Sequence, residues 1–92
     1  MIQSYKCRQT HKLASGARVK QFEQFESVAR RKLRMLEAAT QLSDLKAPPS
    51  NKLEALKRDR KGQHSIRIND KWRLCFVWKD GHAYNVEIVD YH

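Results

Sequence analysis

The chain has 92 residues, and its 19 Lys and Arg against 10 Asp and Glu give a formal net charge of +9 at pH 7. This length accommodates one domain, residues 1–92, with no room for a cofactor domain beside a catalytic one. The charge favours a polyanionic partner, which is either a nucleic acid or an anionic membrane surface.

The membrane alternative has little support in the sequence. The longest apolar run, Leu74–Trp78, has the length of a strand, whereas a membrane-spanning helix needs about 20 apolar residues. The N-terminus lacks the charged segment and apolar core of a signal peptide, so we expect a cytoplasmic protein with no membrane partner. Cys7 and Cys75 lie far apart and outside any CxxC spacing, so we expect free thiols rather than a disulfide or a zinc site.

The N-terminal half predicts one strand and one long helix. Alternation over residues 2–7 predicts a short edge strand, and the polar residues 8–20 predict no regular element, with Ser15-Gly16 as a helix breaker. A helix from Val19 or Lys20 to Leu42 follows, because apolar residues recur there at three- and four-residue steps. These apolar residues are Phe22, Phe25, Ala29, Leu33 and Leu36.

Basic residues accompany this helix. Arg30, Arg31 and Arg34 lie opposite the apolar stripe, where they form either a solvated surface or a face that contacts phosphate or a partner. Lys32 projects into the apolar sector, so we expect its stem to pack while its ammonium reaches water.

The C-terminal half predicts a sheet. Pro48-Pro49 makes residues 46–51 a linker, since proline ends helices and is excluded from central strands. The period then changes to two, which predicts strands over residues 53–56, 64–68, 72–78 and 84–89, joined by short turns that include Asp80-Gly81. The expected fold is α+β, with an N-terminal strand and helices packed on a twisted antiparallel sheet. Trp72, Leu74, Phe76 and Trp78 should face the helix.

The opposite face of the sheet should be basic. Lys57, Arg58, Arg60 and Lys61 occupy the connection that enters the sheet, and Arg67 and Arg73 project from neighbouring strands within several ångströms of each other. Like charges placed together cost stability unless a polyanion compensates them. This cluster therefore favours binding of a phosphate backbone, and the alternative is a charged surface that serves only solubility.

The last three residues, Asp90, Tyr91 and His92, add three proton-transfer groups. Cleavage of a phosphodiester without a metal needs a base, an acid and cations that stabilise the transition state. With RNA the nucleophile can be the substrate's own 2′-hydroxyl, and His92 titrates near neutral pH. Taken alone, the three residues could equally be a loose tail. Asp90 and His92 are too few ligands for a zinc site, so no metal is expected.

Two longer motifs resemble a known family. The run GQHSIRINDKWRLCF, residues 62–76, resembles the RelE/ParE superfamily of bacterial toxins, and the ending VEIVDYH, residues 86–92, narrows the resemblance to the HigB branch. Residues 38–45 and the Pro48-Pro49 pair before residues 51–54 support it. The resemblance spans nearly the whole chain and implies the RelE-like microbial RNase fold.

The resemblance also implies an activity and its partners. Members of the HigB branch are ribosome-dependent mRNA endonucleases that cut in the ribosomal A site by attack of the 2′-hydroxyl on the adjacent phosphate, without metal or cofactor. The implied partners are a HigA-like helix-turn-helix antitoxin, the 70S ribosome and mRNA, with operator DNA reached only through the antitoxin. The alternatives are a gyrase inhibitor of the ParE type and a non-catalytic protein that binds RNA or the ribosome.

The resemblance assigns functional positions of the family to individual residues of this chain. Asp90, Tyr91 and His92 match the C-terminal catalytic group, Arg73 matches the strand arginine near the scissile phosphate, and Lys57 matches a supporting basic position. Glu54 departs from the pattern, because some members carry a catalytic histidine there. Its carboxylate could act as a base, but it would repel phosphate unless Lys52 or Lys57 screens it. The expected RNA-binding set is Lys57, Arg58, Arg60, Lys61, Arg67 and Glu54.

His64 is a separate candidate. It begins a strand on the same side as Ile66 and Ile68, which points toward the helix rather than the basic face. A structural role is therefore favoured over a catalytic one.

Overall fold

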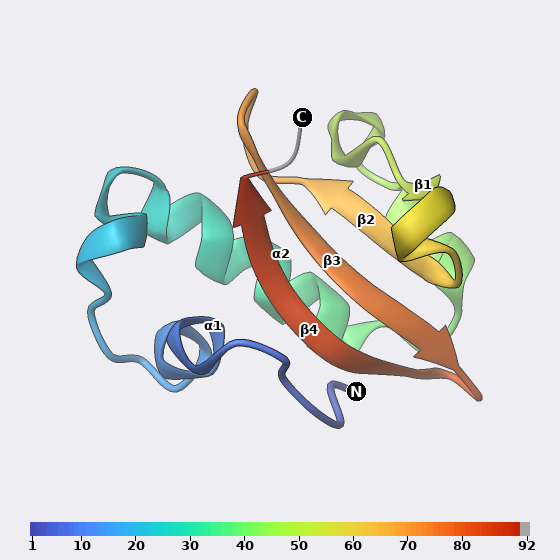
Figure 1. Cartoon of the computed structure of the whole chain (residues 1–92), viewed down its shortest axis with the longest axis horizontal. Coiled ribbons are helices and arrows are strands. Elements are labelled where there is room, and N and C mark those ends of the chain that lie inside the picture. The colour runs from blue at the N-terminus through green and yellow to red at the C-terminus, as the bar shows by residue number, and fades with distance from the viewer. Residues whose placement is uncertain (91–92) are drawn as a thin grey trace.

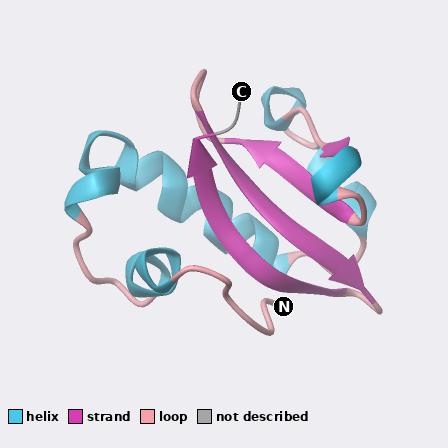
Figure 2. Ribbon diagram, in the orientation of Figure 1, coloured by secondary structure: helices cyan, strands magenta, loops and turns pink. Residues whose placement is uncertain are grey.

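The computed structural model describes residues 1–90 and shows a four-stranded antiparallel sheet with helix α2 against one face (Figure 1). The strand order is β1-β2-β3-β4, a simple meander, which confirms the predicted α+β architecture (Figure 2). The helices and strands are α1 Arg8–Ala14, α2 Glu26–Ala38, β1 Glu54–Ala55, β2 Gln63–Arg67, β3 Trp72–Lys79 and β4 His82–Asp90. Short 3₁₀ helices span Lys20–Phe25, Leu42–Lys46, Pro49–Asn51 and Arg58–Arg60.

The sheet follows from the alternation of the sequence. Ile66 pairs with Leu74, and both are fully buried with Phe76 on the face that meets α2. Trp72 and Trp78 are half-buried against the same core. The β3–β4 connection is the predicted hairpin turn, in which Asp80 and Gly81 both have positive φ as a type I′ turn requires.

The predicted long helix is shorter at both ends. Residues 20–25 form a 3₁₀ helix, from which Phe22 and Phe25 both pack on Trp72 with ring centroids 5.7 and 5.3 Å away. The helix α2 then ends at Ala38. Beyond it, the Asp44 carboxylate accepts the backbone N–H groups of Thr40 and Gln41 at 3.0 and 3.1 Å, which starts a separate turn.

The N-terminal predictions need two corrections. Residues 2–7 are not a regular strand, since the segment makes only two isolated parallel bridges with β4, at Ile2 and Tyr5. Residues 8–14, expected to be irregular, form α1 and end at the predicted Ser15-Gly16 break. This helix is held by tertiary contacts, because buried Thr10 accepts the backbone N–H of Ile88 at 3.0 Å.

Lys32 also differs from expectation. Its ammonium does not reach water but donates a hydrogen bond to the side-chain oxygen of Asn51, and both residues are buried. An ammonium taken out of water needs such a partner, because an unpaired buried charge is costly. None of the helices within residues 1–90 is both long and apolar enough to cross a membrane.

Candidate active site

The face of the sheet that is turned away from α2 carries the polar residues of the strands and is called the outer face below. Its members at the basic end are Ser65 and Arg67 of β2, Arg73 and Cys75 of β3, and Glu87 of β4. Arg67 and Arg73 are direct cross-strand partners, as the sequence predicted. Cys75 is likewise opposite Glu87. The strands therefore place cations and carboxylates together on one surface.

Arg73 is held at three points on the outer face. Its Nε donates to Ser65 Oγ at 2.8 Å, and one Nη2 hydrogen bond reaches the carbonyl oxygen of Lys52, also at 2.8 Å. The Glu54 carboxylate lies 3.8 Å from the same Nη2. The side chain is only 14% exposed. A guanidinium has five N–H donors and these two bonds use two, so within residues 1–90 donors remain for a phosphate oxygen.

A second ion pair covers the centre of the outer face. Arg60 Nη1 lies 2.9 Å from Glu87 Oε1 and 3.1 Å from Gln63 Oε1, and Lys6 approaches the same carboxylate at 3.8 Å. Cys75 is fully buried beside these groups. Burial raises the pKa of its thiol to about 11, so the thiol is protonated at neutral pH and is no nucleophile there.

The basic residues of the outer face have protein partners. Arg67 pairs with Asp70, Arg73 with Glu54 and Arg60 with Glu87. The closeness of these arginines therefore does not require a bound polyanion. The prediction that repulsion between like charges indicates a phosphate backbone is wrong on this point. The Glu54 carboxylate is screened by Arg73 itself, not by the lysines that the sequence suggested.

The remaining basic candidates lie beside this face. Lys57, Arg58 and Lys61 are exposed around the 3₁₀ helix Arg58–Arg60. The hydrogen bond from Leu56 N to the Gln63 carbonyl, 2.9 Å long, closes this loop against β2. The loop thus presents unburied positive charge at the rim, in contrast to the half-buried Arg60.

The C-terminal candidates are described only in part. Val89 is opposite Arg73, and Asp90 is opposite Trp72 at the last position of β4. The end of β4 therefore lies beside Arg73, although alternation assigns Asp90 and Arg73 to different sides of the sheet. The Asp90 carboxylate is 3.6 Å from the Lys71 ammonium. Tyr91 and His92 lie outside the described residues.

Comparison with known proteins identifies the family. Residues 3–92 match the model of the HigB-like toxin family, described as the RelE-like toxin of the type II toxin-antitoxin system HigB. The chain belongs to this family. The RelE-related resemblance read from the two sequence motifs is thereby confirmed.

Individual relatives of this HigB-like chain match over about two thirds of its length. Toxin HigB-1 of Vibrio cholerae serotype O1 is 48% identical over 60 residues, which are 65% of this chain and 63% of that protein. Endoribonuclease HigB of Proteus vulgaris is 36% identical over 61 residues, 66% of this chain and 65% of that protein. The matched region thus spans less than two thirds of these relatives' own length.

Solved structures establish the fold. YafQ from Escherichia coli BL21(DE3) superposes with a TM-score of 0.64 at 16% identity and covers 98% of this chain and 93% of its own. A chain of the heterotetrameric YoeB–YefM toxin–antitoxin complex from Staphylococcus aureus gives a TM-score of 0.58 at 23% identity, with coverage of 100% and 98%. The RelE-like fold prediction is therefore confirmed.

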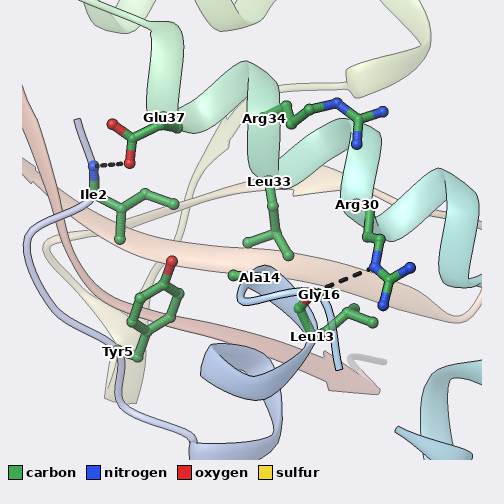
Figure 3. A pocket seen from close by; sticks show the side chains of 9 residues that line it. All are labelled: Ile2, Tyr5, Leu13, Ala14, Gly16, Arg30, Leu33, Arg34 and Glu37. Atoms are coloured by element: carbon green, nitrogen blue, oxygen red, sulfur yellow. Dashed lines mark hydrogen bonds between the residues drawn. The ribbon is translucent and has the colours of Figure 1, made fainter. Parts of the chain in front are cut away.

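Two hollows lie away from the outer face. A cavity of about 310 Å³ opens between the N-terminal segment, α1 and α2, where Arg30 donates to the Leu13 carbonyl and Glu37 accepts the N–H of Ile2 (Figure 3). A hollow of about 500 Å³ adjoins Trp72 and Lys71. Neither is lined by a predicted catalytic residue, although Arg30 and Arg34 of the predicted basic helix face border the first. Within residues 1–90 no three His, Cys, Asp or Glu side chains come together as a metal site.

Sequence reasoning named Glu54 but missed the two other groups that hold Arg73. Ser65 alternates onto the outer face with Gln63 and Arg67, and a small polar residue between two longer polar ones on that face is the one signal that could have pointed to it. The carbonyl of Lys52 carries no signal in the sequence, because every residue has one. His64 is half-buried and stacks on Phe76 with a centroid distance of 6.3 Å, away from the outer face.

Proposed function

We propose that this HigB-like chain is a ribosome-dependent mRNA endonuclease that cuts mRNA in the ribosomal A site and thereby inhibits translation. Membership of the HigB-like toxin family supports the proposal, as does the Proteus vulgaris relative that is named an endoribonuclease. The proposed reaction is attack of the 2′-hydroxyl on the adjacent phosphate, without a metal or cofactor. It yields a 2′,3′-cyclic phosphate and a 5′-hydroxyl.

The observation that carries the proposal is the fixed guanidinium of Arg73. As the O2′–P bond forms and the P–O5′ bond breaks, negative charge builds on the non-bridging phosphate oxygens. A cation that is already oriented by Ser65 and the Lys52 carbonyl need not reorganise to meet this charge, which is the condition for effective electrostatic catalysis. Arg73 is thus assigned to the stabilisation of the transition state.

Proton transfer is assigned to the C-terminal group. One base takes the 2′-hydroxyl proton, and one acid gives a proton to the departing 5′-oxygen. We assign one of these transfers to His92, assign Tyr91 to orienting the nucleotide or sharing the transfer, and assign Asp90 to setting the imidazole orientation. The second candidate base is Glu54, whose half-exposed carboxylate adjoins Arg73. The pairing of Val89 with Arg73 near the end of β4 supports the assignment to the C-terminal group, although Asp90 itself alternates to the other side of the sheet.

Binding is assigned to the basic rim. Lys57, Arg58 and Lys61 are exposed and can meet successive phosphates, while Arg60 and Arg67 line the same side of the sheet. We further propose a cytoplasmic location, the 70S ribosome and mRNA as partners, and inhibition by a HigA-like helix-turn-helix antitoxin. Operator DNA is then reached only through that antitoxin.

Induced expression followed by primer extension on cellular mRNA tests the function. The expected result is growth arrest with new 5′ ends at codon boundaries, which Arg73→Ala and His92→Ala abolish while the circular dichroism spectrum is kept. Growth arrest without new 5′ ends, together with loss of plasmid supercoiling, would instead identify a gyrase inhibitor. Full toxicity of both folded variants would contradict the site assignment.

A further inference from the structure

A buried polar pair links helix α2 to the segment that precedes the sheet. Lys32 is 4% exposed, and its ammonium donates to the side-chain oxygen of Asn51, which is fully buried. Burying an ammonium costs more stability than burying an apolar side chain of the same length. Burial, reinforced by Arg31 and Arg67, lowers the pKa of Lys32 from its ordinary value. Because burial of the Lys32 ammonium destabilises a small core, we expect this side chain to have a function.

The Asn51 side chain shapes the 45–52 segment. Its amide nitrogen donates to the carbonyls of Leu45 at 3.1 Å and Ala47 at 3.2 Å, while its backbone N–H donates to Pro48 at 2.9 Å. One side chain therefore ties together residues on both arms of this turn. Lys32 fixes the oxygen end of the amide, and this determines which end can donate to the two carbonyls.

The next residue in the chain holds the candidate catalytic arginine. Lys52 adopts the left-handed conformation, with φ 45° and ψ 54°, and its N–H donates to the Pro49 carbonyl at 3.1 Å. Its own carbonyl then accepts the Arg73 Nη2 bond, and Glu54 two residues later faces the same nitrogen. A left-handed backbone at a residue other than glycine persists only where its surroundings impose it. Here the Pro49 carbonyl and the Arg73 guanidinium bond the two sides of Lys52, directly after the anchored Asn51.

We propose that Lys32 and Asn51 are positioning residues, which act from the helical side of the sheet by fixing the Lys52 carbonyl and hence the guanidinium of Arg73. The inference rests on the proposed function in assigning Arg73 to the chemistry. The connection from α2 to the outer face is continuous: Lys32 bonds to Asn51, Lys52 follows in the chain, and the Lys52 carbonyl accepts the Arg73 bond. Both Lys32 and Asn51 are buried, so they act through Lys52 and Arg73 rather than by contact with substrate.

Three variants test the pair by kinetics on mRNA-programmed ribosomes. Asn51→Ala removes all of the side-chain bonds, Asn51→Asp keeps the volume and the acceptor for Lys32 but removes both donors, and Lys32→Met keeps the stem without the ammonium. Each should lower kcat roughly ten- to a hundredfold with KM within about twofold, because a misplaced group weakens the transition state more than binding. If Asn51→Ala does not fold, Asn51→Asp carries the test.

A double-variant cycle separates positioning from simple loss of stability. In an Arg73→Ala background the same substitutions should change kcat by less than about twofold, because two residues that act through one group are not additive. Val19→Ala serves as the matched control. It thins the buried core outside the 45–52 segment and should lower the unfolding midpoint without lowering kcat at a temperature where the protein is folded.

A spectroscopic readout keeps the inference independent of activity. The Nε–H resonance of Arg73 in ¹H–¹⁵N spectra should move, and its exchange with water should quicken, in Asn51→Asp but not in Val19→Ala. An unchanged resonance, an equal fall of kcat in the Arg73→Ala background, or the same fall in Val19→Ala overturns the inference. If wild-type protein cuts no RNA while the resonance still responds, the proposed function fails and the positioning network stands.

Discussion

The two faces of the sheet are built from the same strands but differ in the interactions that hold their side chains. On the inner face Ile66, Leu74 and Phe76 are fully buried against α2 and its neighbours. On the outer face Arg73 and Glu87 are held by polar partners at distances near 3 Å. Apolar burial is non-directional, whereas each bond on the outer face fixes one atom in one direction. The inner face should therefore set stability and the outer face the reactivity.

The largest expected effect separates the faces by stability. Phe76→Ala should lower the free energy of unfolding by about 3–5 kcal/mol, because it removes a fully buried ring and leaves a cavity. Urea denaturation followed by tryptophan fluorescence measures this loss. The matched outer-face variant, Arg67→Ala, should change the unfolding free energy by less than about 1 kcal/mol, since its partner Asp70 is almost fully exposed. Equal losses in the two variants would contradict the division.

The next effect separates the faces by chemistry. Arg73→Ala should lower the cleavage rate about 10²–10³-fold, as expected when one preorganised donor is removed from a developing charge. Its cost in stability should be smaller, about 1–2 kcal/mol, because the buried Ser65 hydroxyl loses one partner. Single-turnover cleavage and urea denaturation measure the two quantities.

Arg73→Lys keeps the charge and sharpens that prediction. A lysine cannot satisfy Ser65 and the Lys52 carbonyl together, because it lacks the planar fork of the guanidinium. The rate should therefore stay close to that of the alanine variant. Recovery of most of the activity would mean that charge alone matters at this position.

A weaker effect concerns the exposed rim of the outer face. Replacing Lys57 and Lys61 together with Ala should weaken RNA binding and reduce the slope of log K against log salt by about 1.4, since each contact on a single strand contributes about 0.7. Fluorescence anisotropy of a labelled RNA over a salt series measures the slope. Lys12 of α1 and Arg18 are also exposed and provide the control pair. A similar reduction in that pair would assign the effect to net charge alone.

The sequence could predict the elements that repeat a simple pattern. Alternation within residues 64–68 and within residues 72–78, with turn residues at Asp80-Gly81, predicts the meander and its buried face. Alternation likewise predicts that Arg67 and Arg73 are cross-strand neighbours, as they are in the structure. These predictions succeed because the side chain and the strand period decide them locally.

What the sequence could not predict depends on atoms distant in the chain. The helix α1 has two buried residues, Thr10 and Leu13, so its periodicity is too weak to recognise and its stability comes from contact with α2 and β4. The burial of Lys32 depends on Asn51, 19 residues away, and the orientation of Arg73 depends on a backbone carbonyl. Patterns of residue type do not encode such partners.

The smallest effect concerns the accessibility of Cys75 beneath the ion pairs of the outer face, with Cys7 as the comparison. The raised pKa of Cys75, about 11 against an ordinary 9.0, leaves about 10⁻³ of the thiol ionised at pH 8, and the thiol is also buried. Iodoacetamide at pH 8 should therefore modify the partly exposed Cys7 in native protein and reach Cys75 only after unfolding, as peptide mass spectrometry would show. Equal labelling of both native thiols would mean that the ion pairs do not cover the face.

The same raised pKa gives a signed pH dependence. The folded state holds the Cys75 proton more tightly than the unfolded state, so this contribution to stability is fully present below pH 9 and is lost as pH rises from 9 through about 11. Lys32 has the opposite sign, because its lowered pKa makes stability rise with pH. The unfolding free energy of the wild type as a function of pH therefore contains both contributions. Subtracting the curve of Cys75→Ala leaves the contribution of the thiol. The difference in unfolding free energy between wild type and Cys75→Ala should shrink between pH 9 and 11. The corresponding difference for Cys7→Ala is the control. A Cys75→Ala difference that does not change over this range would mean that the thiol is not enclosed.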